Sequence, residues 1–333
     1  MKFATRNNGL RDGELLVVSR DNQTAASASH VAPNLQHALE HWADCAAELQ
    51  TIYDNLNRGT HRSSFAFHER EMKSPLPRSY AWLDGSAYIN HVVLVRKARG
   101  AEPPATLETD PLMYQGGSDA FLDPHGPIAL GDTQWGCDFE SEIAVVTDDV
   151  PQGTTAEEAH RYVRLVMLVN DVSLRNLIPA ELAKGFGFLQ SKPSSSFSPI
   201  AVTPDELGSA WKDGRVHLPL TTHLNGKLFG EPDSGPEMHF GFYELIAHAA
   251  KSRPLSAGTI VGSGTVSNEE RSKGSSCLAE KRMLEIIDSG AASTPFLQYG
   301  DHVAIEMFQN GKSVFGKIDQ KVVPLDPNHE SGQ

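Results

Sequence analysis

One short segment, Asp138–Val146, reads as a buried β-strand that nevertheless carries acidic side chains in its first half. Side chains alternate along a strand, so Glu140 and Glu142 should point to one face and their neighbours to the other. Two like charges on a buried face repel each other, and a cation between them is the usual way to keep both ionised. Oxygen ligands favour a hard ion such as Mg²⁺ or Ca²⁺. This strand therefore indicates a metal site inside a β-rich core.

A further acid, Asp171, interrupts another apolar run at Leu168–Ser173. A Glu-x-Glu pair by itself is also typical of a solvated strand edge. The second intruding acid and the apolar flanks of both segments favour the divalent-cation interpretation.

Composition limits the classes of partner. The chain has 333 residues, 39% of them hydrophobic, which suits one large domain and a small accessory region. Its net charge of -13, without a strongly basic stretch, argues against nucleic acid and anionic membranes as partners. No run approaches the ~18 apolar residues of a membrane span, and the N-terminus lacks the apolar core of a signal peptide. With three widely spaced cysteines as well, we expect a reduced, cytoplasmic protein.

Local patterns predict the elements around the acidic strand. Residues 1 to about 32 should form two short strands around Asp21-Asn22. Apolar residues at helical spacing over 35–56, followed by Gly59 as a stop, predict a helix. Residues 60–78 are polar and contain two prolines, as expected of a linker. The rest should be mainly β, with hairpins at Asn225-Gly226 and at Asn310-Gly311, the latter between strands 303–307 and 313–317. Further helices are predicted near 86–98, 155–168 and 241–251.

Several common catalytic motifs are absent from the sequence. It contains no His-Glu-x-x-His, no P-loop and no Gly-x-Ser-x-Gly. Gly262-Ser263-Gly264-Thr265 is glycine-rich, but it lacks the lysine and the spacing of a phosphate-binding loop. Nucleotide binding and a serine nucleophile are therefore not indicated.

Ordered landmarks across residues 78–325 resemble the fumarylacetoacetate hydrolase family, and in particular its bacterial members. They are Asp84 followed seven residues later by His91, the Glu140/Glu142 strand, Asn170–Arg175, Lys192 in Ser191-Lys192-Pro193, and Gly264–Ser267.

The resemblance implies a mainly β fold with some helix, the family's mixed β-sandwich roll, preceded by a small α+β N-terminal region. The implied regions are residues 1–77, a catalytic domain over 78–327 and a polar tail over 328–333. It also implies a homodimer and a role in aromatic amino acid catabolism.

The same resemblance implies roles for individual residues. Asp84, Glu140, Glu142 and Asp171 would bind a divalent cation, Mg²⁺ or Ca²⁺, with Mn²⁺ also possible. His91 would activate water, and Glu280 would orient its ring. Arg175 and Lys192 would be catalytic and would contact substrate together with Tyr114 and Thr265.

The chain also departs from the animal fumarylacetoacetases. Ile178 replaces a substrate-contacting glutamine, and Ser86 replaces a tyrosine. The segment from Thr265 to Glu280 is about one residue longer than the family pattern, which leaves Glu269 and Glu270 as alternative partners for His91.

The expected activity is hydrolysis of a carbon-carbon bond in a small 1,3-diketo acid, such as fumarylacetoacetate or an acylpyruvate. Cleavage releases a carbon as an enolate, which a cation and fixed positive charges can stabilise. A histidine is the natural base for the attacking water, because its pKa lies near neutrality. The alternatives are keto-acid decarboxylation or dienoate hydration within the same family, and a binding protein in which the acids hold a structural Ca²⁺.

Overall fold

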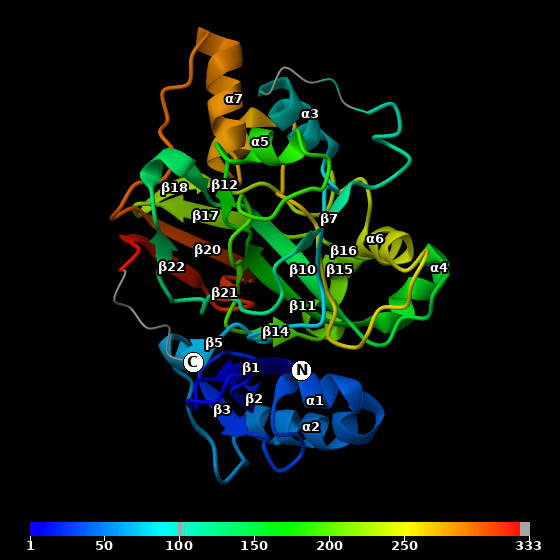
Figure 1. The fold of residues 1–333 in the computed structure, drawn as a ribbon. Helices are drawn as coiled ribbons and strands as arrows, with labels where there is room; N and C mark the ends of the chain where they lie inside the picture. The colour runs from blue at the N-terminus through cyan, green and yellow to red at the C-terminus, as the bar shows by residue number, and fades with distance from the viewer. Residues whose placement is uncertain (99–101, 103, 327–333) are drawn as a thin grey trace.

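The computed structural model describes residues 1–98, 102 and 104–326 (Figure 1). The predicted polar tail at 328–333 lies outside the described residues. The larger sheet is built from β1 (Lys2–Arg6), β2 (Glu14–Val18), β3 (Thr24–Ser27), β4 (Phe65–Ala66), β5 (Met72–Lys73), β6 (Trp82–Gly85), β7 (Met113–Gly116), β10 (Ser141–Thr147), β11 (Val163–Asn170), β13 (Ser196–Phe197), β14 (Ala201–Val202) and β19 (Ile260–Gly262). Its order is β4-β3-β2-β1-β14-β11-β10-β19-β6-β7, with β13 beside β11 and β5 beside β1.

A second sheet and two short ribbons complete the β structure. The second sheet runs β18 (Lys227–Gly230), β17 (Leu220–Leu224), β20 (His302–Gln309), β22 (Ile318–Pro324) and β8 (Ile128–Leu130), with β21 (Lys312–Ser313) beside β20. The ribbons pair β9 (Cys137–Asp138) with β12 (Ser173–Leu174), and β15 (Trp211–Lys212) with β16 (Arg215–Val216).

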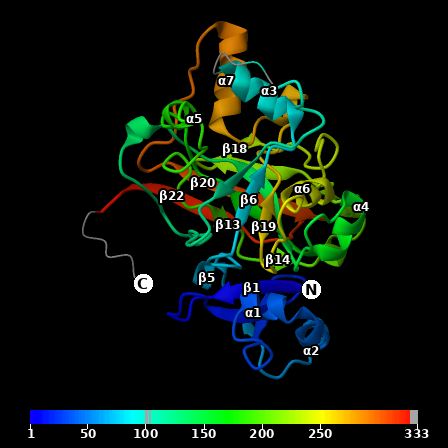
Figure 2. The same cartoon turned by 45° about the vertical axis from the view of Figure 1, so that its right-hand side comes forward.

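The helices lie around these sheets. The α-helices are α1 (Leu35–Glu40), α2 (Trp42–Asn57), α3 (Ile89–Ala98), α4 (Ala156–Ala159), α5 (Ile178–Leu182), α6 (Phe242–Ala249) and α7 (Leu278–Ser289). The 3₁₀ turns are η1 (Glu69–Glu71), η2 (Thr133–Trp135), η3 (His160–Tyr162), η4 (Pro204–Ala210) and η5 (Arg271–Lys273). In both orientations α3 and α7 lie side by side at the end of the molecule opposite α1 and α2 (Figures 1 and 2). None of the described helices is long and apolar enough to cross a membrane.

The central strands are buried on both faces, and alternate residues enter different cores. Ile143 and Val145 of β10 join a cluster that includes Val303 and Ile305 of the second sheet. Ala144 and Val146 join another cluster, which contains residues of β1–β3, α1 and α2. Glu142 lies one residue before Ile143, near the start of β10. Its side chain therefore points to the same face of the strand as Ala144 and Val146.

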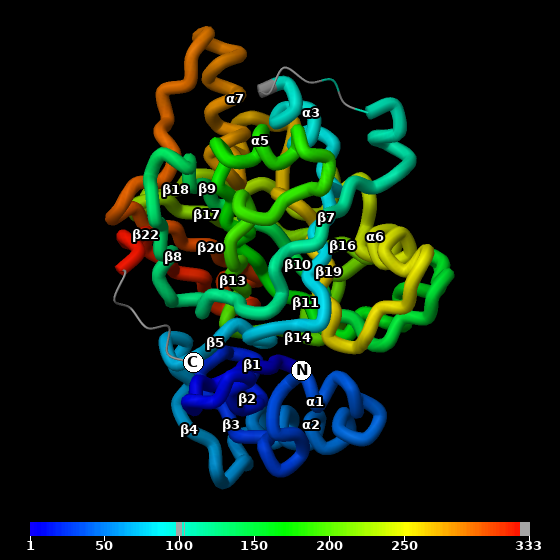
Figure 3. Tube along the Cα trace, viewed as in Figure 1, coloured from blue at the N-terminus to red at the C-terminus, as the bar shows by residue number. Residues whose placement is uncertain are grey.

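The N-terminal region is joined to the rest through the larger sheet. β1 pairs antiparallel with β14, placing Phe3 opposite Ala201. The predicted linker over 60–78 contains β4, η1 and β5, and its two strands pair with β3 and β1. Figure 3 traces the chain from this region into β6 and β7. The division at residue 77 remains a prediction.

The structure corrects four predicted elements. The N-terminal segment up to about residue 32 forms three strands, β1 to β3, rather than two. The helix over 35–56 is divided at His41 into α1 and α2. The helix predicted near 155–168 is wrong beyond Tyr162, where β11 begins, because a strand buried on both faces reads as a continuous apolar run. The hairpin at Asn310-Gly311 is present, but its returning strand is only Lys312–Ser313 rather than 313–317.

Candidate functional site

Adjacent strands bring together three of the predicted metal ligands. Asp84 lies on β6, Glu142 on β10 and Asp171 directly after β11, and β19 pairs with both β6 and β10. One carboxylate oxygen from each residue lies within 4.8 Å of the others. We call these three residues the acidic centre. Each is at least 96% buried, with exposed fractions of 4%, 0% and 0%.

Three carboxylates meet at the acidic centre, and among the described residues one ammonium, that of Lys192, contacts them. Asp171 Oδ2 accepts from the Tyr114 hydroxyl at 2.6 Å and from Lys192 Nζ at 2.5 Å, and its Oδ1 accepts from the Ser195 hydroxyl at 2.7 Å. Asp84 Oδ1 accepts from the Gly264 amide at 3.0 Å. Glu142 Oε2 is buried without a hydrogen-bond partner among the described residues. Burial is the main cause that raises the pKa of Asp84 and of Glu142 well above their ordinary values, and the neighbouring carboxylates raise it further.

These observations fit a divalent cation. Buried carboxylates that repel one another are stabilised by a positive ion, and an all-oxygen ligand set suits a hard ion. The orphaned Glu142 oxygen is the clearest sign, since a buried acceptor without a partner is costly. Asp84, Glu142 and Asp171 are therefore the residues that would hold the ion.

A glycine allows the loop after β19 to approach Asp84. Gly264 has a φ of +75°, and a Cβ at this position would lie 2.4 Å from the carbonyl oxygen of Gly85. Only glycine accommodates both constraints without strain. The next residue, Thr265, donates its hydroxyl to Glu140 Oε1 at 2.9 Å.

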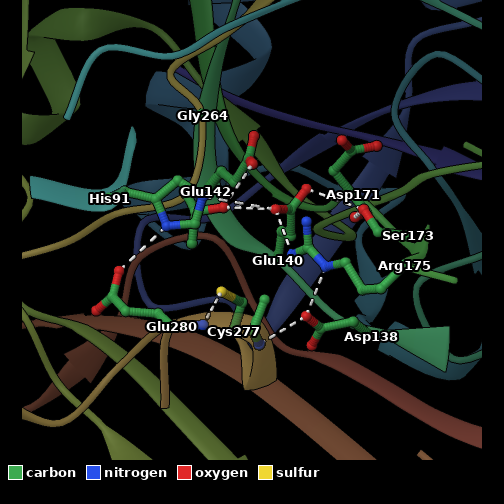
Figure 4. Close-up of polar contacts among 12 residues, drawn as sticks. His91, Asp138, Glu140, Glu142, Asp171, Ser173, Arg175, Gly264, Cys277 and Glu280 are labelled. Carbon is green, nitrogen blue, oxygen red and sulfur yellow. Dashed lines mark hydrogen bonds and ion pairs between the residues drawn. The ribbon is translucent and has the colours of Figure 1, made fainter. Parts of the chain in front are cut away.

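Glu140 lies beside the acidic centre but in a different electrostatic setting. Its Oε1 accepts from Arg175 Nη2 at 2.6 Å, and its Oε2 accepts from the Ser173 hydroxyl at 3.1 Å (Figure 4). Oε2 also accepts from Lys192 Nζ at 2.5 Å. Burial alone would raise the pKa of Glu140, but Arg175 and Lys192 hold it well below its usual range. Of the four predicted ligands, Glu140 and Asp171 are thus paired with basic side chains, whereas Asp84 and Glu142 form no ion pair among the described residues.

Asp138 is a site residue to which the sequence assigned no role. Its Oδ2 accepts from Arg175 Nε at 2.8 Å, and its two oxygens accept the Leu278 and Ala279 amides at 2.7 and 2.9 Å. It therefore holds Arg175 against Glu140 and also satisfies the first amides of α7. The available signal was the alternation Asp138, Glu140, Glu142, which predicts a third acid on the same face.

His91 and Glu280 meet across the α3–α7 contact. His91 Nδ1 lies 3.1 Å from Glu280 Oε2, and His91 Nε2 lies 3.9 Å from Glu140 Oε1 (Figure 4). A carboxylate accepts hydrogen bonds, so this contact places the ring proton on Nδ1 and leaves Nε2 free to accept one. The alternative partners, Glu269 and Glu270, are exposed, and their contacts lie elsewhere.

The remaining predicted contact residues also surround the acidic centre. Lys192 Nζ lies 5.0 Å from the centre of the Tyr114 ring, and the Phe188 ring packs edge-on against Tyr114 at 5.2 Å. Ile178, which replaces the family's glutamine, is buried at the start of α5. A substrate next to Tyr114 would thus meet an aromatic wall as well as charged groups.

Two family models match the chain. The model described as Fumarylacetoacetate (FAA) hydrolase C-terminal matches residues 81–323, and the one described as Fumarylacetoacetase N-terminal domain 2 matches residues 1–78. Together they span both regions of the fold described above.

Individual relatives are more distant. The chain is 26% identical over 192 residues to 2,4-didehydro-3-deoxy-L-rhamnonate hydrolase of Sphingomonas sp., covering 57% of this chain and 64% of that protein. It is 25% identical over 206 residues to oxaloacetate tautomerase YisK of Bacillus subtilis, covering 61% and 64%. A crystal structure of maleylpyruvate hydrolase from Sphingobium sp. SYK-6, with manganese(II) and pyruvate, superposes with a TM-score of 0.66 at 14% identity, covering 98% of this chain and 100% of that one. From the family models and the shared fold, the chain belongs to the fumarylacetoacetate hydrolase family.

Proposed function

We propose that this protein is a metal-dependent hydrolase that cleaves a carbon-carbon bond in a small 1,3-diketo acid, such as fumarylacetoacetate or an acylpyruvate. One observation carries the proposal: the His91–Glu280 pair, at 3.1 Å, lies next to three buried carboxylates, and one oxygen of Glu142 has no hydrogen-bond partner among the described residues. A base for water and a place for a cation thus occur side by side. A divalent cation, Mg²⁺, Ca²⁺ or Mn²⁺, would when bound supply Lewis-acid polarisation of substrate oxygens.

His91 would remove a proton from water at Nε2 while Nδ1 remains hydrogen-bonded to Glu280. The hydroxide adds to one carbonyl, the bond between that carbonyl carbon and the intervening carbon breaks, and its electron pair leaves as an enolate. Return of the proton to the enolate carbon gives a carboxylic acid and a ketone, so one water is consumed. Glu280 stabilises the charged ring during the transfer, as in other histidine-acid pairs.

Positive charge near the leaving enolate would come from Lys192. Burial would lower the pKa of its ammonium, but Asp171 and Glu140 raise it, so the group stays protonated. Arg175 is held between Asp138 and Glu140, and it would act by keeping Glu140 ionised as well as by adding positive charge. Fixed charges of this kind lower the barrier when they are aligned before the reaction.

A second function deserves a direct test because one relative is an oxaloacetate tautomerase. Tautomerisation and decarboxylation of keto acids also pass through an enolate, as does hydration of a dienoate, and none of these splits a diketone into two products. Purified, metal-loaded protein should therefore be screened against fumarylacetoacetate, acylpyruvates, oxaloacetate and a dienoate. Two products and no CO₂ from a diketo acid support hydrolysis, whereas CO₂ or enol-keto exchange alone would reject it.

A further inference from the structure

Residues 176–191 form a loop that joins two basic residues, Arg175 and Lys192, which both contact Glu140. Arg175 precedes the loop and contacts Glu140 Oε1 at 2.6 Å, and Lys192 follows it and contacts Glu140 Oε2 at 2.5 Å. Lys192 also reaches Asp171 at 2.5 Å. The path of residues 176–191 therefore determines where the Lys192 ammonium lies relative to the acidic centre.

Glu181, on α5 in the first part of this loop, accepts hydrogen bonds from residues at the other end of the loop. Its carboxylate accepts three successive amides, those of Leu189 at 3.1 Å, Gln190 at 2.7 Å and Ser191 at 3.1 Å. It also accepts the Ser191 hydroxyl at 2.5 Å. The residue is 8% exposed, and these hydrogen bonds lower the pKa of its carboxyl to about 2 although burial acts in the opposite direction. Glu181 thus stays ionised and holds the peptide directly before Lys192.

We call these hydrogen bonds of Glu181 with residues 189–191 the clamp. Ser191 connects the clamp to β12, the strand before Arg175. Its carbonyl accepts the Leu174 amide at 2.8 Å, so both ends of the loop meet at one residue. Between its two ends, the tip of the loop is largely exposed to solvent: Phe186 is 99% exposed and Leu189 is 81% exposed. The tip therefore contacts the site through Phe188, whose ring packs against Tyr114 at 5.2 Å, while Phe186 and Leu189 pack little.

We propose that Glu181 is a positioning residue that holds Ser191, and through it keeps Lys192 between Glu140 and Asp171. The kinetic consequence rests on the proposed hydrolase function, whereas the structural consequence does not. Without the clamp, the loop end would sample several positions, and a displacement of about 1 Å in a positioned charge can cost ~10²-fold in rate.

The first test uses Glu181→Gln, whose amide offers one acceptor and presents N–H groups to the other donors. We expect amide hydrogen exchange to accelerate in the peptide containing residues 189–191, and kcat to fall about 10- to 100-fold with a smaller change in KM. Ser191→Ala removes only the hydroxyl contact. It should give a weaker form of the same pattern and serves if Glu181→Gln does not fold.

A matched control exists on α7. Glu285 accepts the Ser293 amide at 2.7 Å, the Thr294 amide at 2.9 Å and the Thr294 hydroxyl at 2.5 Å, and its pKa is also lowered to about 2. The loop that it holds contains none of the site residues. Glu285→Gln should therefore accelerate exchange at residues 293–294 without changing kcat.

The deciding measurement is a double-mutant cycle with Lys192→Met. If Glu181 acts through Lys192, Glu181→Gln in the Lys192→Met background should cause no further loss of kcat. Independent, multiplicative losses would overturn the inference, and so would unchanged exchange at residues 189–191 in Glu181→Gln. If the wild-type protein cleaves no diketo acid, the proposed function fails, and the exchange comparison with Glu285→Gln still decides whether the clamp exists.

Discussion

Two clusters of charged side chains in this protein differ in charge balance. The acidic centre places Asp84, Glu142 and Asp171 together, with Lys192 reaching Asp171. The second cluster, which we call the balanced cluster, lies where η1 meets β20 and β22. It consists of Glu69, Arg70, His125, His302, Lys317 and Asp319.

In the balanced cluster the carboxylates are surrounded by basic groups. Asp319 Oδ2 lies 3.4 Å from Lys317 Nζ, 3.9 Å from Arg70 Nη2 and 3.9 Å from His125 Nδ1, and Oδ1 contacts His302. Burial would raise the pKa of Asp319, but Lys317 and His302 lower it. In the acidic centre the pKa values of Asp84 and Glu142 shift upward.

The difference shows that a cluster containing acids does not by itself mark a metal site. What matters is whether the protein's own cations satisfy them. Even a cavity does not discriminate, because one of about 240 Å³ lies beside the balanced cluster, lined by Arg70, His125, Pro127, His302, Asp319 and Lys321. The excess of negative charge, three carboxylates with one contacting ammonium among the described residues, is what points to an ion at the acidic centre.

The strongest test of this comparison is Glu142→Ala, which should abolish turnover. It should also remove the stabilisation that a bound cation provides, about 2.7 kcal/mol at a concentration 100 times Kd. Melting temperature with and without added Mn²⁺, or with a chelator, measures this.

Glu142→Gln tests the same cation site more specifically, because it keeps the shape of the side chain and removes one of the charges that repel each other. In chelator it should be at least as stable as the wild type, whereas in saturating cation it should be less stable. A cation-dependent rise in melting temperature that survives both substitutions would show that the acidic centre does not hold the ion.

His91→Ala should have the next largest effect, a loss of at least ~10² in turnover, as expected for a general base. Cation binding at the acidic centre should persist, because its ligands are Asp84, Glu142 and Asp171, whereas His91 groups with Glu140 and Cys277. Glu280→Gln should lose less, since it only orients the ring. Isothermal titration with Mn²⁺ provides the control, and an unchanged kcat in His91→Ala would reassign the base.

Lys192→Met should reduce kcat by roughly 10-fold or more while changing KM less, because its charge acts mainly on the developing enolate. Steady-state kinetics on the best diketo acid separates the two parameters. An increase in KM at constant kcat would mean that Lys192 only binds substrate.

Asp319→Asn should have the smallest effect and should act on stability alone. Loss of its contacts should reduce the free energy of unfolding by about 1 kcal/mol near neutral pH, with kcat unchanged. The folded-state pKa of Asp319 is lowered, so its contribution is present above the ordinary aspartate pKa and disappears as pH falls through the folded value. Urea unfolding at several pH values should show the wild type and the variant converging in acid; a drop in kcat would place this cluster in the reaction.

Much of the local structure follows from sequence patterns. The alternation of Glu140 and Glu142 with apolar neighbours predicts a buried acidic strand, which β10 and its entry segment confirm. The hairpin at Asn225-Gly226 joins β17 and β18, because both turn residues adopt a positive φ. These features depend on neighbours in the chain, so a one-dimensional pattern contains them.

Other features depended on segments that meet only in the folded chain. Periodicity could not show that residues 163–168 extend as β11, since β10 buries one edge of that strand and β13 and β14 the other. Nor could spacing choose Glu280 over Glu269 and Glu270 as the neighbour of His91, because the contact depends on how α3 packs against α7.

For the same reason, the sequence could not distinguish the surroundings of Glu140 from those of Glu142. The sequence by itself determined that both are acids on one face of a buried strand, and that the family's landmarks follow in order. Only the tertiary structure decided that Arg175 and Lys192 lie against Glu140, and that Glu142 Oε2 has no donor within the described part of the chain. The physical reason is that a carboxylate's charge state depends on groups within a few ångströms in space, and those groups come from distant parts of the chain.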